Sequence, residues 1–80
     1  MNISQAVSKR ILDLCQERNI TVNKLRTISA VTQSTVNDIV CGKSKNTGII
    51  TIKKLCDGFG ISITEFFNTD YFRLLEQEIY

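Results

Sequence analysis

The fold is decided by residues 20–43, which read ITVNKLRTISAVTQSTVNDIVCGK. Thr21 and Thr32 each precede a short amphipathic run, and a threonine hydroxyl caps a helix by accepting a hydrogen bond from its first turn. They predict helices over 22–29 and 33–40, joined by a tight turn at Ala30-Val31, and Gly42 is placed to end the second helix. Two helices this short, joined by so tight a turn, cross at a steep angle. Residues 21–42 therefore predict a helix-turn-helix.

The second helix of this pair has two different faces. The residues expected to point inward are Val36 and Ile39, together with Leu25 and Ile28 of the preceding helix. The side chains expected to point outward are short and polar: Gln33, Ser34, Thr35, Asn37 and Asp38. Such groups can bond base edges in a major groove or phosphate oxygens. An ordinary solvated helix face has the same composition, so periodicity alone leaves both interpretations open.

Helical spacing also dominates on either side of this stretch. A first helix is expected over 3–18, where Ser4 can cap its start and Asn19 can end it, because asparagine tolerates the left-handed conformation. A fourth helix is expected over 49–59, ended by Gly60. The residues of this fourth helix that we expect to be buried are Ile49, Ile52, Leu55, Cys56 and Phe59.

The rest of the chain completes an all-α pattern. Gly58, in the last turn of the fourth helix, should cost about 1 kcal/mol relative to alanine, so that helix end is expected to fray. Ser62 and Glu65 form a capping box that opens a fifth helix, and the tail at 70–80 continues with helical spacing. The sequence therefore predicts a single domain over residues 1–80: a compact five-helix fold with a short C-terminal helical tail.

The charge is unevenly distributed along the 80 residues. Residues 1–54 contain nine Lys and Arg against three Asp and Glu, a net charge of +6. Residues 55–80 contain one Arg against five Asp and Glu, a net charge of −4. One end of the domain could therefore face a polyanion, although a chance distribution over a solvated surface would look the same.

Several classes of protein are disfavoured by composition. The three cysteines Cys15, Cys41 and Cys56 form no CxxC motif and there is no histidine, which argues against a four-ligand zinc site and against a Ser–His or Cys–His nucleophile pair. We expect no enzyme, no metal and no small-molecule cofactor, and we expect the cysteines to be small apolar side chains in a reducing cytoplasm. No apolar run approaches the ~20 residues of a membrane helix and no signal peptide is evident, so we expect a cytoplasmic protein without a membrane partner.

The stretch 20–43 resembles the helix-turn-helix of the Xre family, the lambda Cro and phage-repressor-like regulators. Residues 51–67, TIKKLCDGFGISITEFF, are similar to that family's fourth helix, glycine turn and fifth-helix start. The resemblance covers residues 11–67. It implies a lambda-repressor-like fold and a transcriptional regulator that binds double-stranded DNA in a sequence-specific manner, with 33–40 in the major groove. It also implies a homodimer on two-fold-related half-sites, and we expect repression.

The resemblance also implies roles for single residues. Gln33, Ser34, Thr35 and Asp38 match base-facing positions of the family, and Asn37 matches a flanking one. The residues that match phosphate-facing positions lie at the start of the second helix and in the following loop: Thr21, Asn23, Lys24, Lys43 and Lys45.

Three residues depart from the family's pattern. Val22 stands where a glutamine that touches phosphate is frequent. Arg26 stands where a small residue lets the two helices approach, so that either the helices spread or Arg26 bends out toward solvent or phosphate; we favour the second. Ala30 replaces a turn glycine, and if the turn needs a positive φ, alanine costs on the order of 1 kcal/mol there.

The alternative function is a protein-interaction module of the same fold, such as an antitoxin-like or partner-binding regulator, with weak or no specific DNA binding. The tail favours this idea because it is more apolar than a terminal helix needs to be. The candidates for a homodimer contact are Tyr71, Leu74, Leu75 and Ile79. An equally good explanation of the apolar tail is that half of its apolar residues pack on the first and fifth helices of their own chain.

Overall fold

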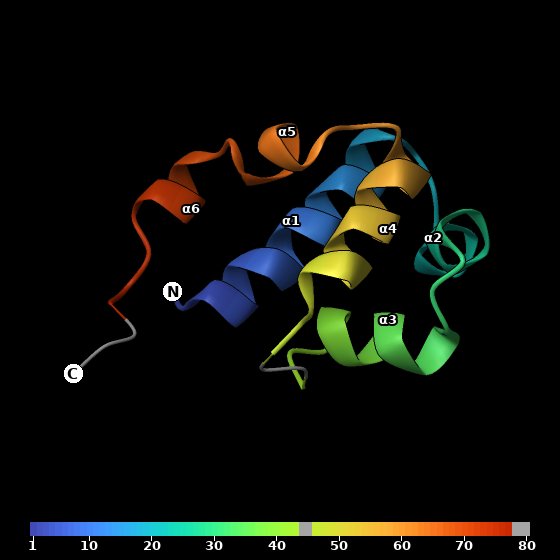
Figure 1. Ribbon diagram of the computed structural model, residues 1–80, viewed down its shortest axis with the longest axis horizontal. Helices are drawn as coiled ribbons and strands as arrows, with labels where there is room; N and C mark the ends of the chain where they lie inside the picture. The colour runs from blue at the N-terminus through green and yellow to red at the C-terminus, as the bar shows by residue number, and fades with distance from the viewer. Residues whose placement is uncertain (44–45, 78–80) are drawn as a thin grey trace.

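The computed structural model describes residues 1–43 and 46–77, which form six α-helices and no β-strand (Figure 1). The all-α prediction is confirmed. The helices are α1 (Ile3–Glu17), α2 (Val22–Ser29), α3 (Gln33–Val40), α4 (Ile49–Phe59), α5 (Ile63–Phe67) and α6 (Asp70–Arg73). In Figure 1, α2 and α3 lie at the end of the molecule opposite α6 and the C terminus.

One apolar core joins the first five helices. α1 packs against α2, α3 and α6, while α4 packs against α2 and α5. The largest fully buried side chains come from all five of these helices and are Ile11, Leu14, Leu25, Val36, Leu55, Cys56 and Phe66. Because the helix-turn-helix contributes Leu25, Val36 and Ile39 to this core, its position is fixed by the whole domain.

The helix ends confirm most of the predicted local chemistry. Thr21 Oγ1 accepts a hydrogen bond from Lys24 N at 3.0 Å, and Thr32 and Ser62 cap α3 and α5 in the same way. Asn19, Gly42 and Gly60 have positive φ, as expected of residues that end helices.

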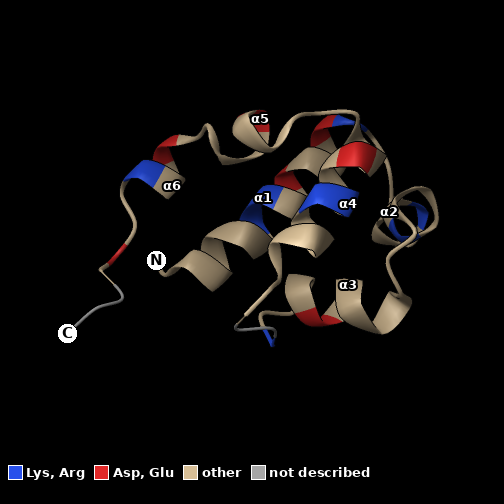
Figure 2. Ribbon diagram, viewed as in Figure 1, with Lys and Arg blue, Asp and Glu red and all other residues tan. Residues whose placement is uncertain are grey.

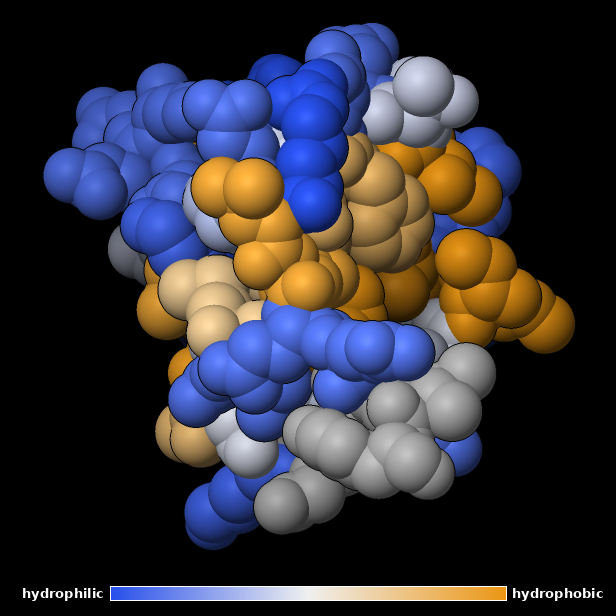
Figure 3. Space-filling model, turned by 90° about the vertical axis from the view of Figure 1, so that its left-hand side faces the viewer, coloured by the Kyte–Doolittle hydropathy of each residue, from blue (hydrophilic) through white to orange (hydrophobic). Residues whose placement is uncertain are grey.

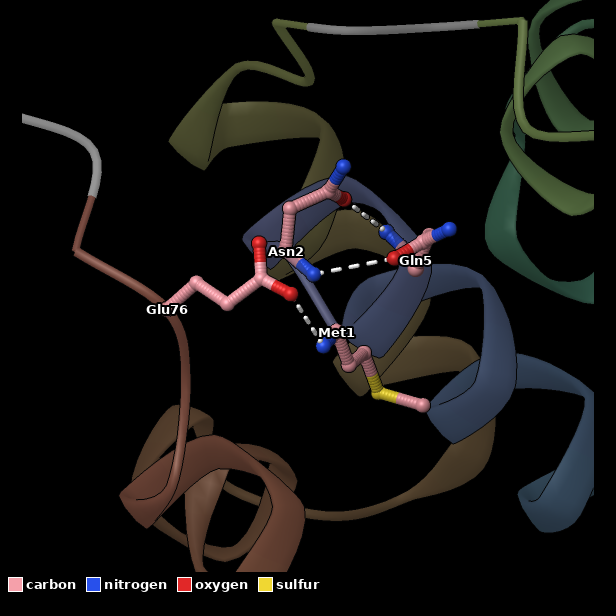
Figure 4. A network of polar contacts seen from close by, with 4 residues as sticks. All are labelled: Met1, Asn2, Gln5 and Glu76. Atoms are coloured by element: carbon pink, nitrogen blue, oxygen red, sulfur yellow. Dashed lines mark hydrogen bonds and ion pairs between the residues drawn. The ribbon is translucent and has the colours of Figure 1, made fainter.

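The cap of α1 was predicted at the wrong residue. Asn2 caps α1 by accepting from Gln5 N, and the Gln5 side chain accepts from Asn2 N, both at 2.9 Å (Figure 4). Ser4 lies inside the helix. The reciprocal pair favours the earlier start, since it satisfies two backbone N–H groups at once.

Two residues predicted to be inward are exposed. Ile28 is 40% exposed, and the buried position on that side of α2 is taken by Ser29. Ser29 keeps its hydroxyl satisfied by donating to Leu25 O at 2.7 Å, so a polar side chain can be buried there. Ile49, 60% exposed, is the first residue of α4 and precedes the part of the helix that reaches the core, which begins at Ile52.

Gly58 is a point of close approach between α2 and α4. A Cβ at Gly58 would lie 3.0 Å from Cβ and 3.1 Å from Cα of Ser29. The last turn of α4 is also secured, because Phe59 is buried and Gly60 ends the helix in the left-handed conformation. The missing side chain of Gly58 therefore allows α2 to pack tightly against the last turn of α4.

The tail is helical over a shorter stretch than predicted. α6 ends at Arg73, and the Thr69 side chain makes no capping hydrogen bond at its start. The chain then returns to the start of α1, where Glu76 N donates to Met1 O at 3.2 Å and Glu76 Oε1 lies 2.9 Å from the Met1 amino group (Figure 4). The tail was predicted to continue as a helix to residue 80, but it instead makes these contacts with Met1. Residues 78–80 lie outside the described part.

We predict that Gly58→Ala destabilises the protein. At an unhindered helical site this change stabilises by about 1 kcal/mol. Here the added methyl group meets Ser29, and overpacking costs roughly 1–3 kcal/mol, so we expect a net loss of about 1 kcal/mol in the free energy of unfolding. Urea unfolding followed by circular dichroism measures it, and a gain in stability would show that α2 and α4 are not in close contact.

Candidate nucleic-acid interface

α3 is held to the domain along one face only. Val36 and Ile39 are buried, and Ser8 Oγ on α1 donates to Val40 O at 2.9 Å near the end of the helix. The chain leaves α3 through Gly42, which has φ 77°. These contacts fix the direction of α3 and leave its opposite face in solvent.

The exposed face of α3 contains the side chains predicted to point outward. Gln33, Ser34, Asn37 and Asp38 are exposed. Thr35 differs, because it is half-buried and its hydroxyl accepts a hydrogen bond from the Thr32 hydroxyl at 2.9 Å. The structure thus brings the base-facing candidates Gln33, Ser34 and Asp38 and the flanking Asn37 onto one accessible polar surface, with Thr35 at its edge.

The turn between α2 and α3 requires a left-handed residue at position 30, where the family usually has glycine. Ala30 has φ 58° and ψ 27°, which is the left-handed region. An alanine there costs on the order of 1 kcal/mol, as expected from the sequence. The helix pair is formed in spite of this strain, because the buried residues of α2 and α3 hold it from both sides.

Some cations of the domain form ion pairs and others do not. Lys9 pairs with Asp13, Lys53 with Asp57 and Arg73 with Asp70. Lys24 and Lys43, like Arg18 and Lys54, are exposed and form no ion pair with any residue of the described part. Figure 2 shows basic residues on α2 and in the segment just beyond the end of α3. Lys45, the other predicted phosphate-facing lysine of the loop, lies outside the described residues.

Another basic residue of the N-terminal half serves the fold. Arg10 Nε donates to Phe66 O at 2.7 Å and its Nη2 donates to Glu65 O at 2.9 Å. These carbonyls belong to α5, so Arg10 ties α1 to α5. Its charge therefore adds little to the surface around α3.

Arg26 turns to the surface between α2 and α3. Its Nε and Nη2 donate to Asn23 Oδ1 at 3.3 and 3.1 Å. α2 and α3 remain packed against each other. The helices are not spread by this large residue, because its side chain bends outward. Beside it lies a hollow of about 250 Å³, lined by Val22, Asn23, Arg26, Gln33, Val36 and Asn37.

The cysteines divide into two kinds. Cys15 and Cys56 are buried, and burial raises the pKa of both thiols. Cys41, at the C-terminal end of α3, is exposed and therefore lies outside the apolar core. The described residues contain no group of His, Cys, Asp and Glu that could hold a metal ion, and none of their helices is long and apolar enough to cross a membrane.

The predicted dimer residues do not share one exposed face. Tyr71 is half-buried against α1, with its hydroxyl 3.5 Å from Asp13 Oδ2 and Lys9 Nζ 5.3 Å from its ring centre. Burial, followed by the Asp13 carboxylate, raises the pKa of Tyr71. Leu75 is also half-buried, whereas Leu74 is 80% exposed. Ile79 lies outside the described residues.

Comparison with known proteins defines the class to which this arrangement belongs. The chain matches the family model of the Cro/C1-type HTH DNA-binding domain over residues 10–70. It therefore belongs to this family of helix-turn-helix domains, and it is an Xre-like regulator whose partner is double-stranded DNA.

A solved structure supports the same assignment. The crystal structure of the prophage Lp1 protein 11 is similar to this chain with a TM-score of 0.80 and 36% sequence identity, over 90% of this chain and 96% of that one. Among curated proteins, no significant match was found.

The hollow beside Arg26 is the part of the surface that sequence reasoning missed. Val22 and Arg26 are four residues apart on α2, so helical spacing alone places them on one face. The sequence does not show that Gln33, Val36 and Asn37 of α3 close a hollow against them, because that depends on how α2 is placed against α3.

Proposed function

We propose that this protein is a cytoplasmic, sequence-specific repressor of transcription, with residues 1–80 acting as one domain and α3 reading the major groove of double-stranded DNA. The observation that carries the proposal is the exposed polar face of α3 beside cations that form no ion pair in the described part of the chain. The proposed base contacts are Gln33, Ser34, Thr35, Asn37 and Asp38. The proposed phosphate contacts are Thr21, Asn23, Lys24, Arg26, Lys43 and Lys45.

Each proposed base contact matches a known mode of readout. Gln33 is the first residue of α3, and a glutamine amide can bond the N6 and N7 atoms of adenine together. Asp38 can accept from the amino group of cytosine, or it can reject other bases by repulsion. Ser34 and Thr35 are short enough to bond a base or a phosphate, and the Thr35 methyl group can pack on thymine.

The affinity must come from the cations around α3. The one charge on α3 is the carboxylate of Asp38, which repels phosphate. Lys24 and Arg26 lie on α2, and Lys43 lies just beyond the end of α3. Each phosphate that a cation neutralises releases counterions from the duplex, and this release favours binding. A domain bound in this way represses by occupying a promoter, which agrees with the resemblance to phage repressors.

We predict that Gln33→Ala relaxes sequence preference at one base pair. Selection from random duplexes should give a defined site for the wild type, and the variant should lose about 1–3 kcal/mol of discrimination at a single position. Gln16→Ala, on the exposed side of α1, is the matched control and should bind as the wild type does. A wild type that selects no sequence would contradict specific regulation.

We also propose a homodimer formed through the tail, in which exposed Leu74 makes the central contact. The other proposed contacts are Tyr71 and Leu75, which are half-buried, and Ile79. Two α3 helices that enter successive major grooves need centres roughly 34 Å apart, so the proposed dimer must hold its two copies of α3 at that spacing. Figure 3 shows hydrophobic side chains gathered on the face that includes the N terminus and α6. Leu74 is 80% exposed, and Met1 and Ile3, at the start of α1, are also exposed.

We predict that Leu74→Glu converts the dimer to a monomer. A carboxylate buried between two copies has no partner and strongly disfavours association. Sedimentation velocity measures the change, and circular dichroism should remain that of the wild type. Leu12→Glu is the control, because Leu12 is 43% exposed on α1 and outside the proposed contact. A monomeric wild type, or a variant that still dimerises, would refute the tail interface.

A further inference from the structure

The hollow between α2 and α3 combines an apolar floor with one cation. Val22 and Val36 are its apolar residues, and Asn23, Gln33 and Asn37 contribute amide groups. Arg26 is the single charged residue among those that line it. The hollow therefore offers contact surface for an apolar ring beside a binding group for an anion.

We propose that this hollow is a subsite for one sugar-phosphate unit of the DNA backbone, in which Arg26 binds the phosphate and Asn23 positions Arg26. The inference rests on the proposed DNA-binding function and specifies how one part of that interface works. The deoxyribose packs over Val22, which is half-buried, while the phosphate oxygens accept from the guanidinium.

The hydrogen bonds of Arg26 determine which of its donors remain available. Asn23 Oδ1 accepts from Nε and Nη2, so one side of the guanidinium is held toward α2. Nη1 keeps its donors for a ligand, and a guanidinium forms strong charge-assisted bonds to phosphate oxygens. Since no described carboxylate pairs with Arg26, the charge is available to the backbone of the duplex.

Asn23, one of the proposed phosphate contacts, acts on this phosphate through Arg26 and is therefore a positioning residue. A free arginine side chain loses much rotamer freedom when it is ordered by a ligand. The two bonds to Asn23 order it before DNA arrives, and ordering in advance lowers the cost of binding. Asn23 and Arg26 are three residues apart on α2, the spacing at which helical side chains meet.

The two departures from the family's pattern in α2 are explained together by this subsite. Where the family frequently has a glutamine, this chain has the apolar Val22 at the start of α2. Where the family has a small residue, one turn later, this chain has the cation Arg26. In the structure both line the same hollow. The pair thus replaces a neutral polar contact with an apolar surface and a charged one.

The test is a scan of backbone phosphates on the duplex that the wild type selects. Each phosphate is replaced singly by an uncharged methylphosphonate, and the affinity is measured by fluorescence anisotropy. We expect one position at which neutralisation weakens the wild type about tenfold but weakens Arg26→Ala less than twofold. Asn23→Ala, which keeps the charge of Arg26, should reduce the tenfold effect to about threefold.

Lys24→Ala is the control, because it removes a neighbouring cation of α2 and should leave the tenfold effect at this position intact. Equal losses for wild type and Arg26→Ala at every phosphate would overturn the subsite, and an unchanged effect in Asn23→Ala would overturn the positioning role. A changed base preference in Arg26→Ala would also overturn the proposal, because the guanidinium would then read a base. A wild type that binds no duplex would refute the proposed function as well. Specific binding in which no phosphate effect depends on Arg26 would refute the subsite alone.

Discussion

The attachment of α3 through one buried face is the constraint on which the rest of the molecule depends. Val36 and Ile39 enter the core, and Ser8 holds the carbonyl of Val40 at the far end of the helix. A helix of eight residues would not be stable in isolation, so these contacts supply both its stability and its direction. The polar face that remains outside is rigid because the inner face is fixed.

The packing of α2 sets the geometry of the whole interface. Gly58 on α4 lets Ser29 approach, and α2 then lies close enough to the core to bury Leu25 completely. This position places Asn23 and Arg26 next to the first turn of α3, where the hollow forms. A glycine in α4 therefore acts, through α2, on the surface that we propose to meet the DNA backbone.

The features that the sequence predicted correctly depend on local chemistry. Thr21, Thr32 and Gly42 mark helix ends through bonds and dihedral angles within a few residues, and the exposure of Gln33 follows from helical periodicity. The errors arose where distant segments meet. Ser29 is buried where α2 meets Gly58, whereas Ile28, which was predicted to be inward, is exposed. The tail leaves its helix and contacts Met1, just before α1.

The central claim is that the outer face of α3, with the start of α2, is the surface that binds DNA. The most direct test is a titration of ¹⁵N-labelled protein with the duplex that the wild type selects from random sequences. The changes in amide chemical shift are measured at each step of the titration. The claim predicts the largest changes in α3, at the start of α2 and around Lys43. Binding with α3 unperturbed, and with the changes confined to α5 and α6, would contradict it.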